Sequence, residues 1–390
     1  MPFELKQNVA VALREYFERR EGEVLSLMRA LVEAESPSGD VEGNGVVVSL
    51  LAEAAREIDL ETDATFESDP QFGMHLRIRA FGDGANDAQT TLILGHTDTV
   101  HPRGSIQARP WREEDGRIYG PGIFDMKANC ALALESLRAC ATLKLRPIRP
   151  VVILLTCDEE VGSQSGRALV ELEARRAAQV LVFEPSAPGG RAKTARKGTS
   201  TYTVRAKGVA AHSGLEPEKG ASAILEIARQ IERLHALNDA ARGVTLNAGV
   251  VSGGTRSNVV AAEAETEVDA RFSTMEDALS LDETISNLRP FDERVKLSVE
   301  GGINRPPLER SEAVGTLYEH ARGIASAFDF ELGEASVGGA SDGNFAAAVG
   351  ATVLDGLGIA GDGAHAAHEH ILRADIARRG AFLAALLVTL

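Results

Sequence analysis

The sequence predicts an α/β fold in which a mainly parallel, doubly wound sheet domain carries an inserted α+β domain. Strand-like apolar runs alternate with helical patterns over the first half of the chain. The next stretch, of about 100 residues, instead shows alternating strands and two helices in the order β-α-β-β-α-β, typical of a split βαβ unit. In addition, 390 residues exceed what one hydrophobic core usually supports. We therefore expect a discontinuous larger domain, residues 1–196 and 305–390, and an inserted domain, residues 197–304.

The larger domain takes its elements from both ends of the chain. Helical spacing of apolar residues predicts a helix over 4–34 that ends at the SPSG sequence 36–39. The remaining elements are expected to be helices over 41–58 and 128–143, strands near 75–79, 91–94, 151–156, 179–183 and 352–354, and a terminal helix. A polar, turn-rich loop at 81–87 separates the first two strands.

The inserted domain is bounded by turn signals. The SAPGG sequence at 186–190 precedes it, and the Pro-Pro pair at 306–307 marks the return to the larger domain. Within it we expect strands over 201–206, 245–251, 264–272 and 295–299 and helices over 221–237 and 275–288.

Composition narrows the classes of function. A net charge of −16 disfavours binding to nucleic acid or to an anionic membrane, since both favour clustered Lys and Arg. No apolar run reaches membrane-spanning length. The three cysteines form no CxxC pair, which fits a reducing compartment. We expect a soluble, cytoplasmic protein that acts on a small molecule.

Polar side chains follow the predicted strands at their carboxyl ends, where ligands bind in an open α/β sheet. The strand at 91–94 runs into the sequence GHTDTV, which carries His96 and Asp98. A metal-bound histidine usually donates its second ring N–H to an oxygen acceptor, and Asp98 is close enough in sequence to orient His96 in this way.

Further ligand-type residues occur at corresponding places: Asp125, Glu159, Glu160, Glu184 and His365. Two imidazoles with several carboxylates suit two divalent ions of the zinc type. Asp125 fits a carboxylate bridging ions about 3.5–4 Å apart, because flanking glycines let its loop approach closely. The neighbours Glu159 and Glu160 cannot both face one ion from an extended strand, so one of them is available as a general base.

Several motifs together resemble those of the dinuclear zinc aminoacylase and carboxypeptidase superfamily, peptidase family M20. The matching segments are GHTDTV (95–100), GPGIFDMK (120–127), DEEVGS (158–163), FEPS (183–186), GVAAHSG (208–214), SNVV (257–260), DAR (269–271) and His365. The resemblance covers the chain from about residue 20 onward and is closest to bacterial glutamate carboxypeptidases.

The resemblance implies a role for each ligand-type residue. His96 and Glu184 would hold one zinc ion, Glu160 and His365 the other, and Asp125 would bridge them, with Co²⁺ or Mn²⁺ as alternative metals. His368 is the alternative to His365. Glu159 would be the catalytic base, and Asp98 would orient His96.

The resemblance also assigns the inserted domain as a lid that forms a homodimer. His212 would stabilise the tetrahedral oxyanion, while Asn258 and Arg271 would bind the substrate carboxylate. Arg305 matches a third substrate-binding position, and an Arg fork is also what an acidic protein needs to bind an anion.

We therefore expect a zinc-dependent hydrolase of N-acyl amino acids or short peptides with a free C-terminal carboxylate, releasing glutamate. One alternative is a deacylase of the acetylornithine or succinyl-diaminopimelate type, which shares every metal ligand. An alternative of another class is a catalytically silent metal-binding or scaffold protein.

Overall fold

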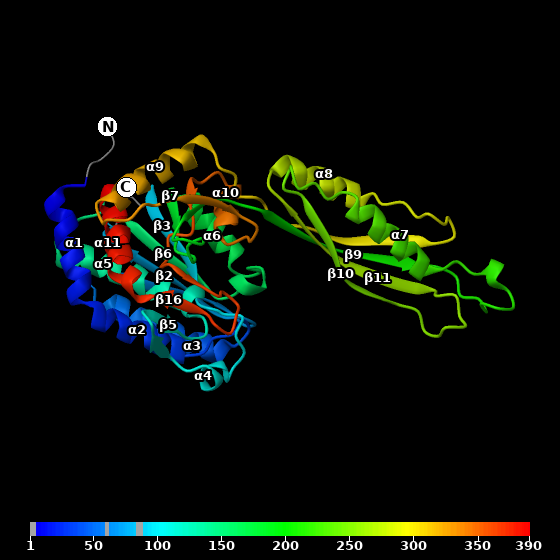
Figure 1. Ribbon diagram of the computed structural model, residues 1–390, viewed down its shortest axis with the longest axis horizontal. Helices are drawn as coiled ribbons and strands as arrows, with labels where there is room; N and C mark the ends of the chain where they lie inside the picture. Colours follow the sequence, from blue (N-terminus) through cyan, green and yellow to red (C-terminus); the bar gives the residue numbers. More distant parts are fainter. Residues whose placement is uncertain (1–4, 59–61, 83–88) are drawn as a thin grey trace. The chain divides into compact units, whose positions relative to one another are not determined.

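The computed structural model describes residues 5–58, 62–82 and 89–390 (Figure 1). The chain forms two compact units. The large unit comprises Met1–Ala195, Arg310–Val337 and Ser341–Leu390, and the small unit comprises Arg196–Glu309 and Gly338–Ala340.

The large unit is built on a six-stranded sheet with the order β1-β2-β6-β3-β7-β14. Its strands are β1 (Asp63–Asp69), β2 (Gly73–Ala80), β3 (Thr90–His96), β6 (Val151–Thr156), β7 (Ala177–Val182) and β14 (Val353–Leu354). Strands β6, β3, β7 and β14 run parallel, whereas β2 is antiparallel to β6, and β1, which we did not predict, is antiparallel to β2. The predicted α/β fold with a mainly parallel sheet is confirmed.

Helices cover both faces of this sheet, as its parallel strands require, because every residue of β3 and β6 is buried. One group of helices contains α1 (Gln7–Arg19), α2 (Glu21–Glu33), α3 (Val41–Arg56), α5 (Ala128–Thr142) and α11 (Arg373–Thr389). On the other side lie α6 (Arg167–Ala174) and α10 (Gly343–Ala348), as Figure 1 shows. Helix α9 (Glu312–Ser326) packs on α11 and β14.

The N-terminal helix differs from the prediction. A single helix over 4–34 was wrong, because the chain leaves helical geometry at Arg20, which has φ −95° and ψ 4° between α1 and α2. Its Nε lies 2.9 Å from Oε1 of the buried Glu135 on α5. This partly buried ion pair is a contact that helical periodicity does not reveal. Residue 4, and residues 83–87 of the predicted loop, lie outside the described residues.

The small unit is a four-stranded antiparallel sheet with two helices on one face (Figure 1). Its elements follow the expected order: β9 (Gly198–Lys207), α7 (Ala223–His235), β10 (Thr245–Gly253), β11 (Glu263–Phe272), α8 (Met275–Ser286) and β12 (Lys296–Arg305). The strand order is β10-β11-β9-β12. Alternate residues of β9, such as Tyr202 and Val204, are buried beneath the helices, so the opposite face carries the polar residues.

The connections between the main elements of the large unit contain short strands. β4 (Arg112–Glu114), β5 (Arg117–Tyr119), β15 (Gly361–Asp362) and β16 (His370–Leu372) form one small sheet, β8 (Ala192–Arg196) and β13 (Glu334–Val337) pair separately, and α4 (Ser105–Ala108) is a single turn. The loop between β15 and β16 carries His365. No described helix combines the length and hydropathy needed to cross a bilayer.

Candidate dinuclear metal site

His96 stands at the end of β3, the strand that lies between β6 and β7. The preceding residue is Gly95, where a Cβ would lie 2.5 Å from Cε of Met126, so glycine leaves room for that side chain. The imidazole Nδ1 lies 2.9 Å from the backbone oxygen of Asp98, which can only accept, so Nδ1 donates there. This bond directs Nε2 toward Oδ1 of Asp125, at 3.1 Å, and Oε1 of Glu184, at 3.4 Å.

Asp125 connects this group to a second one. Its Oδ1 faces His96, and its Oδ2 lies 3.4 Å from Nε2 of His365. The same nitrogen of His365 lies 3.1 Å from Oε2 of Glu160. Two sets of potential ligands therefore share one carboxylate, and in each set the ligand atoms lie within 4.8 Å of one another. We call these five residues the central cluster: His96, Asp125, Glu160, Glu184 and His365.

Electrostatics in the central cluster favour a cation at both imidazoles. Burial opposes a charged His96, but its hydrogen bonds with Asp125, Asp98 and Glu184 outweigh that cost and raise its pKa well above the ordinary value. Hydrogen bonds with Asp125 and Glu160 raise the pKa of His365 to about 10. Burial raises the pKa of Glu160, whereas the two imidazoles lower that of Asp125 against the effect of its burial.

The residues present fit a pair of divalent ions. Oε1 of Glu160 is buried and has no hydrogen-bond partner among the described residues. Leaving such an oxygen unsatisfied costs free energy, and a bound cation would satisfy it. Mixed imidazole and carboxylate donors suit Zn²⁺, Co²⁺ or Mn²⁺.

The carboxylate of Asp98 organises the turn that carries Glu159 and Glu160. It accepts N–H bonds from both residues, each at 3.2 Å, and a 2.6 Å bond from the hydroxyl of Ser38. The two glutamates lie in a 3₁₀ turn, Glu159–Val161, where successive side chains point about 120° apart. Glu160 therefore joins the central cluster, whereas Glu159 is not one of its members.

His212 and Asn258 are neighbours in the small unit. The backbone N–H of Ser213 donates to the oxygen of Asn258 at 3.1 Å. Nδ1 of His212 accepts N–H bonds from Gly214 and Leu215, each at 3.2 Å. Because Nδ1 is an acceptor, Nε2 carries the proton, and the exposed His212 presents an N–H donor.

Arg271 and Arg305 also belong to the small unit, and both pair with Thr199 from opposite sides, on β11 and β12. Neighbouring strands lie about 4.8 Å apart, so the two arginines flank one residue in a single row across the sheet. Nε of Arg271 lies 3.0 Å from Oδ1 of Asp269, and its Nη1 donates to the backbone oxygen of Gly338 at 3.0 Å. Arg305 is buried.

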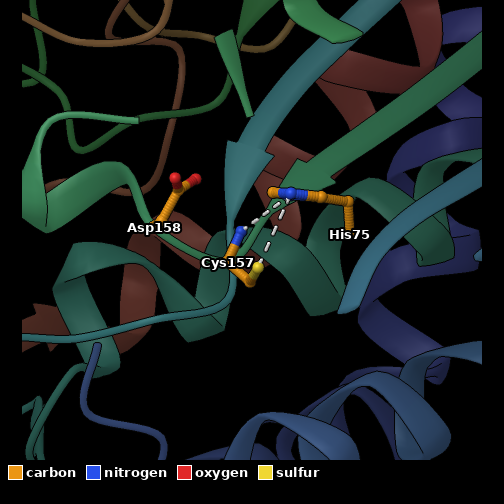
Figure 2. A group of neighbouring side chains, drawn as sticks. All are labelled: His75, Cys157 and Asp158. Atoms are coloured by element: carbon orange, nitrogen blue, oxygen red, sulfur yellow. Dashed lines mark hydrogen bonds between the residues drawn. The ribbon is translucent and has the colours of Figure 1, made fainter. Parts of the chain in front are cut away.

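A third group of ligand-type residues, His75, Cys157 and Asp158, is buried beside β6 (Figure 2). The dashed lines in Figure 2 join Cys157 to His75, whereas the bonds of the Asp158 carboxylate go to other residues. It accepts bonds from the backbone N–H and the hydroxyl of Ser165, at 2.6 and 2.9 Å, and from the N–H of Gly166 at 3.2 Å.

The other two side chains of this third group, His75 and Cys157, also have hydrogen-bond or contact partners. Because the Ser165 hydroxyl donates to Asp158, it accepts from Nε2 of His75 at 3.0 Å. Nδ1 of His75 accepts the N–H of Cys157 at 3.3 Å. Burial raises the pKa of the Cys157 thiol, whereas metals bind the thiolate. We interpret this group as a hydrogen-bonded support for the loop after β6.

Sequence analysis missed two residues that support the central cluster. Ser38 binds Asp98, and the carboxylate of Glu369 accepts the backbone N–H of Asp125 at 2.9 Å. In each of these bonds the two residues are more than 50 positions apart in the sequence. The sequence signal was slight: Glu369 is an acid between two histidines, a few residues after His365.

Comparisons with known proteins agree with the fold and identify the family. A family model described as "Peptidase family M20/M25/M40" matches residues 92–389. Carboxypeptidase G2 of Pseudomonas sp. (strain RS-16) is 28% identical over 371 residues, which are 94% of this chain and 88% of that protein.

Two solved structures share the fold at low sequence identity. Aminopeptidase PepT of Bacillus cereus superposes with a TM-score of 0.74 at 20% identity, covering 94% of this chain and 97% of its own. The YXEP protein of Bacillus subtilis, described as a dinuclear metal-binding peptidase from the M20 family, gives a TM-score of 0.67 at 14% identity and covers 96% and 98%.

The fold and the donor set define a metal-dependent hydrolase of the peptidase or amidohydrolase class, of a type that usually binds two ions. The chain belongs to peptidase family M20/M25/M40.

We predict that the central cluster binds metal and the third group does not. Metal-free protein dialysed against Zn²⁺ should take up about two ions per chain. His75→Gln should take up the same amount, whereas His365→Gln should retain about one ion, because one of the two sets loses its imidazole. Atomic absorption after gel filtration measures both. Loss of an ion in His75→Gln alone would show that the third group is a metal site.

Proposed function

We propose that the protein hydrolyses the amide bond of N-acyl amino acids or short peptides that carry a free C-terminal carboxylate, with glutamate as the favoured released residue. The observation that carries the proposal is the Asp125 carboxylate, whose two oxygens face two imidazoles that each have a further carboxylate beside them. One ion would be held by His96, Asp125 and Glu184, and the other by Asp125, Glu160 and His365. Bound divalent ions act as Lewis acids and lower the pKa of water.

Glu159 is the proposed proton carrier. Its backbone is fixed by Asp98 next to Glu160, but its own side chain lies outside both ligand sets. It would accept the proton of the attacking water and deliver it to the departing amide nitrogen, so that the amine leaves neutral.

His212 is the proposed donor to the oxyanion. The two backbone N–H bonds to Nδ1 fix the tautomer with the proton on Nε2. A donor held in this way needs no reorganisation when negative charge develops on the carbonyl oxygen, and this is the condition for effective oxyanion stabilisation.

Arg271, Arg305 and Asn258 are the proposed binding groups for the substrate carboxylate. Two arginines beside Thr199 give a local positive charge in a protein with a net charge of −16, and guanidinium groups bind carboxylates in two-point geometry. The relative named Carboxypeptidase G2 supports a substrate with a free C-terminus. The resemblance of the motifs to bacterial glutamate carboxypeptidases supports glutamate.

The small unit is also the proposed lid and homodimer surface. Apolar side chains are exposed on α7 and on the edge strand β10: Ile224, Leu225, Val250 and Val251. An exposed edge strand with apolar residues favours association with another chain. Sedimentation equilibrium tests the expected dimer, and a monomer at micromolar concentration would exclude it.

A substrate panel tests the proposed activity. The zinc-loaded protein is incubated with benzoyl-glutamate, a folate, acetylornithine, succinyl-diaminopimelate and dipeptides, and products are identified by mass spectrometry. We expect glutamate from the first two. Cleavage of acetylornithine or succinyl-diaminopimelate instead would favour the deacylase alternative, and no turnover of any compound would favour the silent scaffold.

Arg271→Ala should weaken binding of the substrate carboxylate. We expect a rise in KM of about 10- to 100-fold for a free carboxylate, because a charge-assisted hydrogen bond contributes about 1.5–3 kcal/mol, and little change for the corresponding C-terminal amide. Arg205→Ala is the matched control, since Arg205 is an exposed arginine of the same sheet that is paired with Glu265 and Glu300. Equal effects on acid and amide would exclude the binding role.

Glu159→Gln should bind as much metal as the wild type but lose about 10²- to 10⁴-fold in kcat, the usual contribution of a general acid-base group. Steady-state kinetics and metal analysis on the same sample measure the two quantities. A kcat near that of the wild type would remove Glu159 from its role as proton carrier.

A further inference from the structure

Glu369 makes an unusual set of contacts beside the central cluster. Its side chain is buried, and its carboxylate accepts the backbone N–H groups of Gly122 at 2.8 Å, Phe124 at 2.8 Å and Asp125 at 2.9 Å. Nε2 of His101 lies 2.5 Å from the same carboxylate. Four donors therefore satisfy one buried carboxylate, and three of them belong to the loop that presents Asp125.

The side-chain donor, His101, is itself held in place by Arg109. Nη2 of Arg109 lies 3.2 Å from Nδ1 of His101, so Nδ1 accepts and Nε2 donates to Glu369. Nη1 of the same guanidinium donates to the backbone oxygen of Ala366 at 3.4 Å. Arg109 thus contacts both His101 and the residue after His365.

The loop that Glu369 binds cannot easily take up this shape alone. Gly122 has a φ of 71°, which favours glycine, and a Cβ there would lie 2.5 Å from Cγ2 of Thr99. Its N–H donates to Oε2 of Glu369, and those of Phe124 and Asp125 donate to Oε1, an arrangement of backbone N–H groups that favours an anion. The Glu369 carboxylate accepts all three N–H groups.

We propose that Glu369 is a positioning residue that fixes the bridging carboxylate of Asp125 relative to His365. Glu369 follows His365 by four residues on the same β15–β16 connection, and through it this connection binds the Gly122–Asp125 loop, 244 residues away along the chain. Oδ2 of Asp125 and Nε2 of His365 lie 3.4 Å apart, and Glu369 holds the segments that carry both residues. This role rests on the proposed dinuclear site.

Cobalt binding tests the proposal without relying on activity. Metal-free Glu369→Gln is titrated with Co²⁺, and the visible absorption of bound cobalt gives affinity and ligand geometry. The amide keeps the side-chain volume but turns an NH₂ toward N–H donors. We expect affinity for at least one ion to fall by about 10–100-fold, the usual cost of losing a group that orients a metal ligand, with a changed cobalt spectrum.

Glu173→Gln is the matched control. Glu173 is equally buried, and Arg77 and Arg79 pair with it at 3.0 and 3.6 Å. It lies in α6, and among the described residues no hydrogen bond or ion pair joins it to the central cluster. Its substitution should lower the melting temperature and leave cobalt affinity and spectrum unchanged. The difference between the two variants separates positioning of the metal ligand from general stability.

Arg109→Ala is the second variant, in case Glu369→Gln does not fold. Arg109 is only half-buried, and its loss should shift cobalt affinity in the same direction but by less. Wild-type affinity and spectrum in Glu369→Gln, or in Arg109→Ala where only that variant folds, would overturn the positioning role alone. A wild-type protein that binds no cobalt would overturn the proposed dinuclear site itself, and this proposal with it.

Discussion

The Asp125 carboxylate, shared between two imidazoles, is the contact on which the central cluster depends. Each imidazole also faces another carboxylate, so five ligand-type side chains meet in a space that is buried at His96 and open at His365. Carboxylates brought together in this way repel one another unless positive charge lies between them. The raised pKa of His365, to about 10, shows how strongly the surroundings favour a cation there. Metal ions supply the same positive charge without the proton, which is why metal binding and proton release are coupled in such sites.

The order of the sheet determines which side chains can meet. His96 ends β3, the strand that lies between β6 and β7, and the turns after these two strands carry Glu160 and Glu184. A carboxylate is therefore delivered on each side of the central imidazole by parallel strands whose carboxyl ends share one edge. Asp125 and His365 are supplied by connections instead, and connections need their own anchors. The buried Glu369 is the anchor that both of them use.

Much of this arrangement could be predicted from the sequence because it is local. His96, Glu160 and Glu184 each follow an apolar run that reads as a buried strand, and the order of elements in the small unit follows from alternation and turn signals. The contacts that could not be predicted join distant segments. Arg20, at the break between α1 and α2, pairs with Glu135 on α5, and Glu369 binds a loop 244 residues earlier. No periodicity or spacing encodes such pairs, since they depend on the completed packing of the chain.

Hydrogen-bond donors distinguish the carboxylates that support this fold from those suited to metal. Asp98, Asp158 and Glu369 each accept at least two backbone N–H bonds, and each fixes a loop in doing so. Backbone N–H groups, which are fixed by the fold, already satisfy these carboxylates. A cation could bind there only by displacing those hydrogen bonds. Asp125 and Glu160 instead turn their oxygens toward imidazole nitrogens, and one oxygen of Glu160 has no hydrogen-bond partner among the described residues. Proximity of His, Cys and Asp side chains is therefore not sufficient to define a metal site. In the third group, around His75, the polar atoms that could bind a metal already form hydrogen bonds with neighbouring side chains and with the backbone.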